Sequence, residues 1–228
     1  MNLPTPVIIG IDLSGPSNTQ DTALVVFFPR DEELRLEQTA AGIGDGAILE
    51  IVSGLSAAGN IAVGLDAPLS YNPGGGDRPG DQALRTALHQ AGLASGSVMT
   101  PTMTRMAYLT LRGMAVARGL ELAVGKKASA EKTRIELAIA EVHPAGALIL
   151  RGAPLQAVRD LKSDPAGRQV LLAWLEAQGL RGTASLTDAD DHLVAACAAA
   201  LGVWGWMQGR PAWNHPAQPP LHPYAYVC

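Results

Sequence analysis

Three apolar stretches of this chain each end in an acidic residue, namely Asp12, Asp66 and Glu141. A short, nearly continuous apolar stretch is typical of a buried parallel strand. A carboxylate at the end of such a strand loses water and needs a cation or hydrogen-bond donors, unless it simply starts a turn. Because ligands bind at the carboxyl ends of strands in an open α/β sheet, the three acids predict a divalent-metal site for phosphate chemistry.

A fourth acidic cluster, at residues 188–191, precedes an apolar helix. Acids at this position commonly cap the helix or interact with its dipole, so capping is the alternative to metal binding for each of them. Asp191 lies deepest in the expected helix and is the preferred metal ligand. Asp188 is the second candidate ligand and the preferred cap.

The predicted donors are carboxylates without a Cys–His cluster, which favours Mg²⁺ or Mn²⁺ over Zn²⁺. Two such ions about 3.5–4 Å apart can hold the attacking and leaving oxygens of an in-line displacement. Clustered carboxylates repel one another when no metal is bound, so we expect some of their pKa values to be raised. The candidate metal ligands are Asp12, Asp66, Glu141, Asp191 and Asp188.

Three further residues are candidates for catalysis or substrate binding. His143 follows Glu141 by two positions and shares a strand face with it, so it could orient water or phosphate, or support the acid by a hydrogen bond. Arg78 and Arg85 flank a helix start and could bind phosphate bidentately, with a surface ion pair as the alternative. The other histidines show no metal-ligand spacing and are expected at the surface or in the tail: His89, His192, His215 and His222.

The hydrophobic pattern predicts the elements that must position these residues. The first three strands can form an antiparallel meander, and a helix then carries the chain across so that the fourth strand runs parallel to the first. If those two strands are neighbours, Asp12 and Asp66 lie side by side. The expected strands are 7–13, 23–28, 34–39, 61–66 and 135–141, and the expected helices are 45–58, 81–90, 105–118, 165–178 and 188–207.

A length of 228 residues and a hydrophobic content of 47% favour one domain over residues 1–228. Residues 67–104 form a long, glycine- and proline-containing stretch, and a loop of this length inside a compact domain is usually functional or disordered. We therefore expect an inserted loop and helical region at about 67–125. Residues 208–228 are expected to form an irregular C-terminal tail.

The formal net charge of −4 and the pI near 5.7 argue against a protein that coats nucleic acid through bulk positive charge. They are compatible with an enzyme that contacts one phosphodiester. Two cysteines make no disulfide framework, which fits a reducing, cytoplasmic location. We expect no signal peptide and no membrane-spanning segment, because the N-terminus lacks a basic region before an apolar one and the longest apolar stretch, 193–207, is short for a bilayer.

Taken in order, several segments resemble domain-of-unknown-function family 429, a predicted-nuclease family of the ribonuclease-H-like superfamily. The resemblance rests on residues 9–12, 64–69, 78–81 with Arg85, 141–144 and 190–192. It implies an α/β, ribonuclease-H-like fold with a mixed five-stranded sheet in the order 3-2-1-4-5, flanked by helices.

The resemblance also implies a site that depends on Mg²⁺ or Mn²⁺. Asp12 corresponds to the acid of the first strand, Asp66 to that of the fourth and Glu141 to that of the fifth. The acid of the last helix is then Asp188, Asp190 or Asp191. The chain departs from the family pattern one turn into that helix, where it has Val194-Ala195-Ala196 and the family often has a further Asp-Ala pair.

The resulting expectation is a divalent-metal-dependent nuclease or phosphodiesterase that acts on a nucleic acid or nucleotide by two-metal hydrolysis. One alternative is an ATP-phosphate-binding protein, because residues 10–15 are similar to the first phosphate loop of sugar-kinase, heat-shock and actin-like proteins. A catalytically degenerate binding module is the other.

Overall fold

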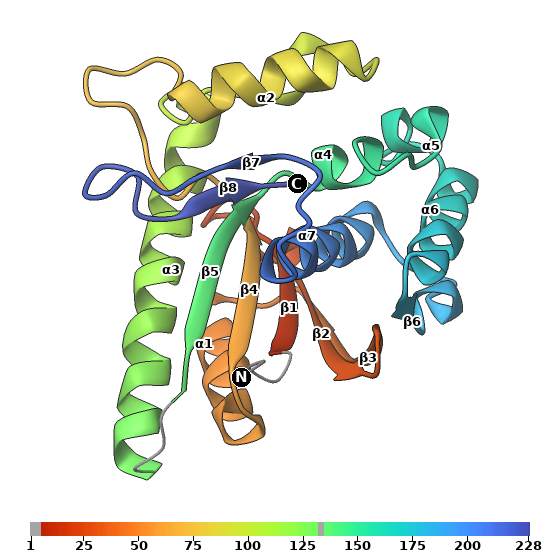
Figure 1. The fold of residues 1–228 in the computed structure, drawn as a ribbon. Coiled ribbons are helices and arrows are strands. Elements are labelled where there is room, and N and C mark those ends of the chain that lie inside the picture. The colour runs from red at the N-terminus through yellow and green to blue at the C-terminus, as the bar shows by residue number, and fades with distance from the viewer. Residues whose placement is uncertain (1–5, 132–134) are drawn as a thin grey trace.

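A central β-sheet organises the protein, whose computed structural model describes residues 6–131 and 135–228 (Figure 1). The strands are β1 (Val7–Asp12), β2 (Ala23–Arg30), β3 (Glu33–Ala41), β4 (Ile61–Asp66), β5 (Leu137–Val142), β6 (Leu180–Arg181), β7 (Asn214–His215) and β8 (Ala225–Val227). They form one eight-stranded sheet in the order β6-β3-β2-β1-β4-β5-β8-β7. Residues 1–5 and 132–134 of the expected domain lie outside the described residues.

The first five strands pair as a mixed sheet. β1, β2 and β3 form the predicted antiparallel meander, whereas β4 runs parallel to β1, and β5 runs parallel to β4. The expected size of five strands is wrong, because β6 lies outside β3, and β8 and β7 lie outside β5. The order 3-2-1-4-5 is present only as the interior of the larger sheet. β6, β7 and β8 contain two or three residues each, which is too short to show a periodic pattern.

Helices cover both faces of this sheet. They are α1 (Asp45–Gly54), α2 (Pro79–Gln90), α3 (Thr104–Glu131), α4 (Pro144–Ile149), α5 (Leu155–Arg159), α6 (Pro165–Ala177) and α7 (Asp191–Met207). The described residues also contain four 3₁₀ turns: η1 (Thr19–Asp21), η2 (Leu55–Ala58), η3 (Ser95–Ser97) and η4 (Thr183–Ser185). α3 extends well beyond the expected 105–118, and the expected tail at 208–228 contains β7 and β8.

Alternating residues of β1 contribute to two hydrophobic cores. Ile9 and Ile11 pack with residues of α1 and α3, whereas Ile8 belongs to the core formed with α7, α6 and α4. Figure 1 shows α3 and α1 on one side of the sheet and α7 on the other. The sheet is thus buried on both faces, which explains the nearly continuous apolar sequences of β1 and β4.

Glycines in the two central strands allow α7 to lie directly on the sheet. A Cβ atom at Gly10 would lie 1.9 Å from the carbonyl oxygen of Ala196, and one at Gly64 would lie 2.5 Å from that of Ala199. Only a residue without a side chain fits such a close approach. The small residues of α7 therefore bring the start of this helix to the edge at which β1 and β4 end.

The inserted region covers that same edge. α2 lies across the end of the sheet, and α3 begins beside it (Figure 1). A Cβ atom at Gly113 of α3 would lie 2.8 Å from the carbonyl oxygen of Pro68, so α3 packs closely against the loop after β4. Within the two described ranges, no helix has both the length and the apolarity needed to cross a membrane.

Candidate functional site

Asp12 and Asp66 are the last residues of two adjacent parallel strands and are direct partners in the register. Burial raises the pKa of Asp12 and raises that of Asp66 further, because the negative charge of Asp12 also disfavours ionisation of Asp66. The predicted juxtaposition of these two acids is therefore present. They form a pair of neighbouring carboxyl groups whose ionisation is disfavoured by burial, and for Asp66 also by the charge of Asp12.

His192, in the first turn of α7, contacts this pair. Its Nδ1 lies 2.7 Å from Oδ2 of Asp12, and its Nε2 lies 3.7 Å from Oδ2 of Asp21 and 4.0 Å from Oδ1 of Asp191. The hydrogen bond with Asp12 raises the pKa of His192 to about 9, so the imidazole is protonated at neutral pH. The sequence prediction placed His192 at the surface or in the tail and did not include this contact, although its position beside the acids at the helix start was a usable signal.

The acidic residues before α7 have distinct positions. Asp190, not Asp188, caps the helix, because its Oδ1 accepts a hydrogen bond from the backbone N–H of Leu193 at 2.8 Å. Asp191 lies in the first turn and lines the cavity described below. Asp188 is exposed and is not among the lining residues.

Glu141 is bound by Arg78 in a buried ion pair. Arg78 Nη1 donates to Oε2 of Glu141 at 2.7 Å, and Nη2 donates to Oε1 at 2.5 Å. Glu141 Oε2 also accepts the backbone N–H of Leu69 at 2.8 Å. Both carboxylate oxygens therefore already have donors, as a buried acid requires.

The remaining donors of Arg78 are also used. Its Nε and Nη2 donate to the carboxylate of Asp81, and its Nη1 donates to Oγ of Ser70 at 3.2 Å. The guanidinium lies over the ring of Tyr226, 5.3 Å from its centroid, and Arg78 is only 5% exposed. All five N–H groups of an arginine are thereby engaged, so Arg78 cannot bind a phosphate without breaking these contacts.

Arg85 lies away from the acids and ties two loop segments together. Its Nη1 and Nη2 donate to the carboxylate of Asp77 at 2.5 and 3.0 Å, and its Nη2 also donates to the carbonyl oxygen of Val98 at 2.9 Å. Hydrogen bonds from Arg85 and then from Thr100 lower the pKa of Asp77 to about 2. Arg85 is not among the residues that line the cavity, so the ion-pair alternative describes its contacts.

His143 supports the backbone around the site. It caps α4, where Nδ1 accepts the backbone N–H of Gly146 at 3.0 Å, while Nε2 lies 2.9 Å from the carbonyl oxygen of Ser97. These partners require a neutral ring with its proton on Nε2. Burial also lowers the pKa of His143. Both ring nitrogens are engaged by backbone groups, so His143 is hydrogen-bonded as the alternative expected, but to the backbone and not to Glu141.

A cavity of about 370 Å³ opens at the ends of these strands and unites most of the predicted residues. Its lining includes Asp12, Asp66, Glu141, Asp191, His143 and Arg78, and it also includes His192 and Lys162. Lys162 is exposed in the turn between α5 and α6, and its charge lowers the pKa of Asp66 against the larger effect of burial. No motif surrounds Lys162, so its place at the cavity was not predictable from the sequence.

The carboxylates differ in how well they suit a metal ion. Asp12 and Asp66 are adjacent and half-buried, and their surroundings disfavour ionisation of both carboxyl groups, which suits a hard cation with oxygen ligands. Glu141 is instead paired with Arg78. In the part of the chain that the structure describes, no group of three or more His, Cys, Asp or Glu residues is arranged to hold a metal ion. The chemistry of the donors thus fits one ion at Asp12 and Asp66.

Arg112 on α3 fixes the loop that follows β1. Its Nη1 donates to the carbonyl oxygen of Ser14 and to Oγ1 of Thr22, both at 2.8 Å, and its Nε donates to Oδ1 of Asp45 at 2.7 Å. Because Ser14 lines the cavity, Arg112 shapes the wall next to Asp12. The residues next to Arg112 in the sequence do not indicate this position, since its partners lie 67 to 98 residues away.

A family model described as "Protein of unknown function (DUF429)" matches residues 10–220. The match covers all of the acidic candidates as well as His192 and Lys162. A comparison with curated proteins finds no match.

Proposed function

The chain belongs to the DUF429 family, whose function is unknown, and we propose that it is a divalent-metal-dependent phosphodiesterase or nuclease with a ribonuclease-H-like fold. The observation that carries the proposal is the pairing of Asp12 and Asp66 at the ends of adjacent parallel strands, where both have raised pKa values. The interior strand order β3-β2-β1-β4-β5 supports the proposed fold. We expect a nucleic acid or nucleotide as substrate and a cytoplasmic location.

Asp12 and Asp66 would hold one Mg²⁺ or Mn²⁺, and Asp191 is positioned to support it from the same cavity. Such ions are usually bound by one or two carboxylates together with water and substrate phosphate. When bound, the ion supplies an activated water and neutralises charge on the phosphate. A second ion at Glu141 would require Arg78 to release that carboxylate. Hydrolysis with two metal ions therefore needs a rearrangement of this ion pair that hydrolysis with one ion does not need.

In the proposed hydrolysis, the oxygen of water forms a bond to phosphorus and the bond from phosphorus to the leaving oxygen breaks. The leaving oxygen keeps the bonding electron pair and takes a proton, while the attacking water loses one. Protonated His192 orients Asp12 through the 2.7 Å contact and adds positive charge near the phosphate. Exposed Lys162 supplies a second positive charge at the cavity, which favours an anionic substrate.

The direct test is hydrolysis of bis(p-nitrophenyl) phosphate with Mn²⁺. We expect Asp12→Asn and Asp66→Asn to reduce the rate to that of the uncatalysed reaction while both variants keep the wild-type circular dichroism spectrum. Glu50→Gln, an exposed acid on α1, is the matched control and should keep the wild-type rate. Hydrolysis that is unchanged in both aspartate variants would remove these residues from the site.

A catalytically degenerate binding module is the second candidate, and the Arg78–Glu141 ion pair favours it because it occupies one of the expected metal ligands. Failure of Mn²⁺ to bind in a calorimetric titration would support this candidate over the enzyme. The ATP-binding alternative is addressed by a melting experiment, in which stabilisation by ATP but not by Mn²⁺ alone would favour it.

A further inference from the structure

The cavity has two chemically different parts. The acidic part is formed by the ends of β1, β4 and β5 and by the start of α7. The other part is apolar and comes from the inserted region: Val98, Met99, Met106 and Leu109 line the same cavity. We call these four residues the apolar wall. A ligand that fills the cavity must therefore carry a group suited to each part.

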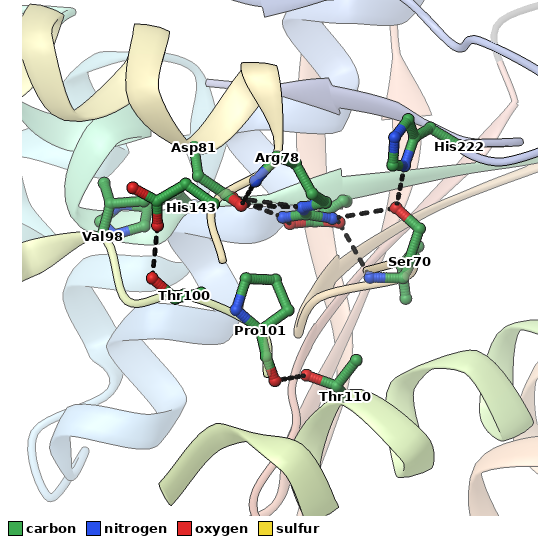
Figure 2. Close-up of polar contacts among 12 residues, drawn as sticks. Ser70, Arg78, Asp81, Val98, Thr100, Pro101, Thr110, His143 and His222 are labelled. Carbon is green, nitrogen blue, oxygen red and sulfur yellow. Dashed lines mark hydrogen bonds and ion pairs between the residues drawn. The ribbon is translucent and has the colours of Figure 1, made fainter. Parts of the chain in front are cut away.

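Polar contacts hold the apolar wall in place at both ends. Arg85 donates to the carbonyl oxygen of Val98, and Thr100 donates to Asp77, which is itself paired with Arg85. On α3, Oγ1 of Thr110 donates to the carbonyl oxygen of Pro101 at 2.9 Å (Figure 2). These contacts fix the segment between α2 and α3 against the first turns of α3. The wall is thus anchored on both sides before any ligand arrives.

Met106 and Leu109 are three residues apart on α3 and therefore lie on one face of the helix. Thr110, which anchors Pro101, lies one residue after Leu109 and is buried. Methionine side chains are flexible and make favourable contacts with aromatic rings through sulfur. Two methionines in a four-residue wall, Met99 and Met106, are suited to a flat aromatic group.

The charges around the cavity favour a small substrate over a long nucleic acid. The described cationic residues that line it are Arg78, His192 and Lys162, and Arg78 is saturated by Glu141, Asp81 and Ser70. Proteins that bind duplex nucleic acid neutralise several phosphates at once, whereas this chain has a formal net charge of −4. A cavity of about 370 Å³ lies within the range of small-molecule sites, roughly 300–1,000 Å³.

From these observations we infer that the cavity binds a phosphate ester the size of one nucleotide, with its phosphate at the acidic part and its base on the apolar wall. This inference rests on the proposed function for the position of the phosphate. The base packs against Met99 and Met106, and the exposed side chain of Lys162 interacts with the phosphate. The preferred substrate is accordingly a single nucleotide ester, and not an internal bond of a duplex.

The test is calorimetric binding of adenosine 5′-monophosphate and ribose 5-phosphate, with and without Mn²⁺. We expect the nucleotide to bind about tenfold more tightly than the sugar phosphate, a difference of about 1.4 kcal/mol. Met99→Ala/Met106→Ala should remove this preference and leave the affinity for ribose 5-phosphate unchanged. Met103→Ala is the matched control, because Met103 is exposed and lies outside the cavity lining. If the double variant does not fold, Met106→Ala alone should reduce the preference.

Equal affinity for the two ligands in the wild-type protein would overturn the inference, as would a preference that survives both methionine substitutions. Tighter binding of a 20-base-pair DNA duplex than of the nucleotide would also overturn it. The proposed function fails separately, through the loss of Mn²⁺-dependent hydrolysis of bis(p-nitrophenyl) phosphate. A preference for the nucleotide without hydrolysis would support the inference and contradict the proposed enzymatic function. Hydrolysis without a preference for the nucleotide would support the proposed function and contradict the inference.

Discussion

Arg78 and Glu141 form a bidentate ion pair in the interior of the candidate site, with N–O distances of 2.7 and 2.5 Å. Arg78 also caps α2, through a hydrogen bond from its backbone N–H to Asp81 at 2.8 Å. The pair therefore joins β5 to the N-terminus of α2. It compensates the charge of Glu141, whereas no arginine within residues 6–131 and 135–228 forms such a pair with Asp66, one strand away, or with Asp12, two strands away.

We predict that Arg78→Met destabilises the protein, because it leaves Glu141 and Asp81 buried without their cation. Removing one partner of a buried ion pair typically costs about 3–5 kcal/mol, measurable by urea unfolding. Arg181→Met serves as control, since Arg181 forms an exposed pair with Glu33 at the surface, and it should leave the midpoint almost unchanged. Equal midpoints for the two variants would contradict the structural role of Arg78.

Gly10→Ala should disturb the contact between β1 and α7. The added Cβ would lie 1.9 Å from the carbonyl oxygen of Ala196, and overpacking of this kind costs about 1–3 kcal/mol or more. We expect a lower melting temperature and weaker Mn²⁺ binding, because the helix start that carries Asp191 and His192 would shift. Gly54→Ala, in α1, meets nothing within 4 Å and should stabilise the protein by about 0.5–1 kcal/mol. A Gly10→Ala variant with the wild-type melting temperature would contradict this, because it would show that β1 and α7 can move apart without a loss of stability.

The contact between His192 and Asp12 should make stability depend on pH. The folded-state pKa of His192 is raised to about 9, compared with an ordinary value of 6.5. A group with a raised pKa contributes stability that is fully present below its unfolded pKa and is lost as the pH rises through the folded pKa. The difference in unfolding free energy between wild type and His192→Gln should therefore be largest below about pH 6.5 and should shrink up to about pH 9. In an Asp12→Asn background this pH dependence should largely disappear, and its persistence there would contradict the assigned partner.

The two candidate acids of the last helix can be distinguished by Mn²⁺ binding. Asp191 lines the cavity with Asp12 and Asp66, whereas Asp188 is exposed outside it. Asp191→Asn should weaken Mn²⁺ binding by about tenfold, which is typical of losing a supporting group of a metal site. Asp188→Asn should bind Mn²⁺ like the wild type. If Asp188→Asn weakened Mn²⁺ binding and Asp191→Asn did not, Asp188 and not Asp191 would be the metal ligand.

The strands that carry Asp12 and Asp66 were predictable, because each is a local apolar stretch and both acids follow directly from strand ends. Their side-by-side position followed from the rule that a helix carries the chain to a parallel strand, and the register confirms it. The helix starts near residues 45, 81 and 165 were also close to those observed. These features depend on patterns within a few neighbouring residues.

Contacts between distant segments were not predictable from one sequence. Arg78 and Glu141 are 63 residues apart, and nothing near Arg78 shows that its guanidinium points inward to an acid. The pairing of β8 with β5 and the position of Lys162 likewise depend on tertiary packing. Asp190 rather than Asp188 caps α7 because the helix begins three residues later than expected.

Calorimetric titration of the metal-free protein with Mn²⁺, in two buffers of different ionisation enthalpy, tests the central claim most directly. Asp66 has a pKa well above its ordinary value, and a carboxylate must lose its proton to bind metal. We predict one Mn²⁺ per chain, proton release that increases as the pH is lowered through the raised pKa of Asp66, and loss of both effects in Asp66→Asn. Absence of Mn²⁺ binding, or equal binding by Asp66→Asn, would contradict the proposal that Asp12 and Asp66 form a metal site.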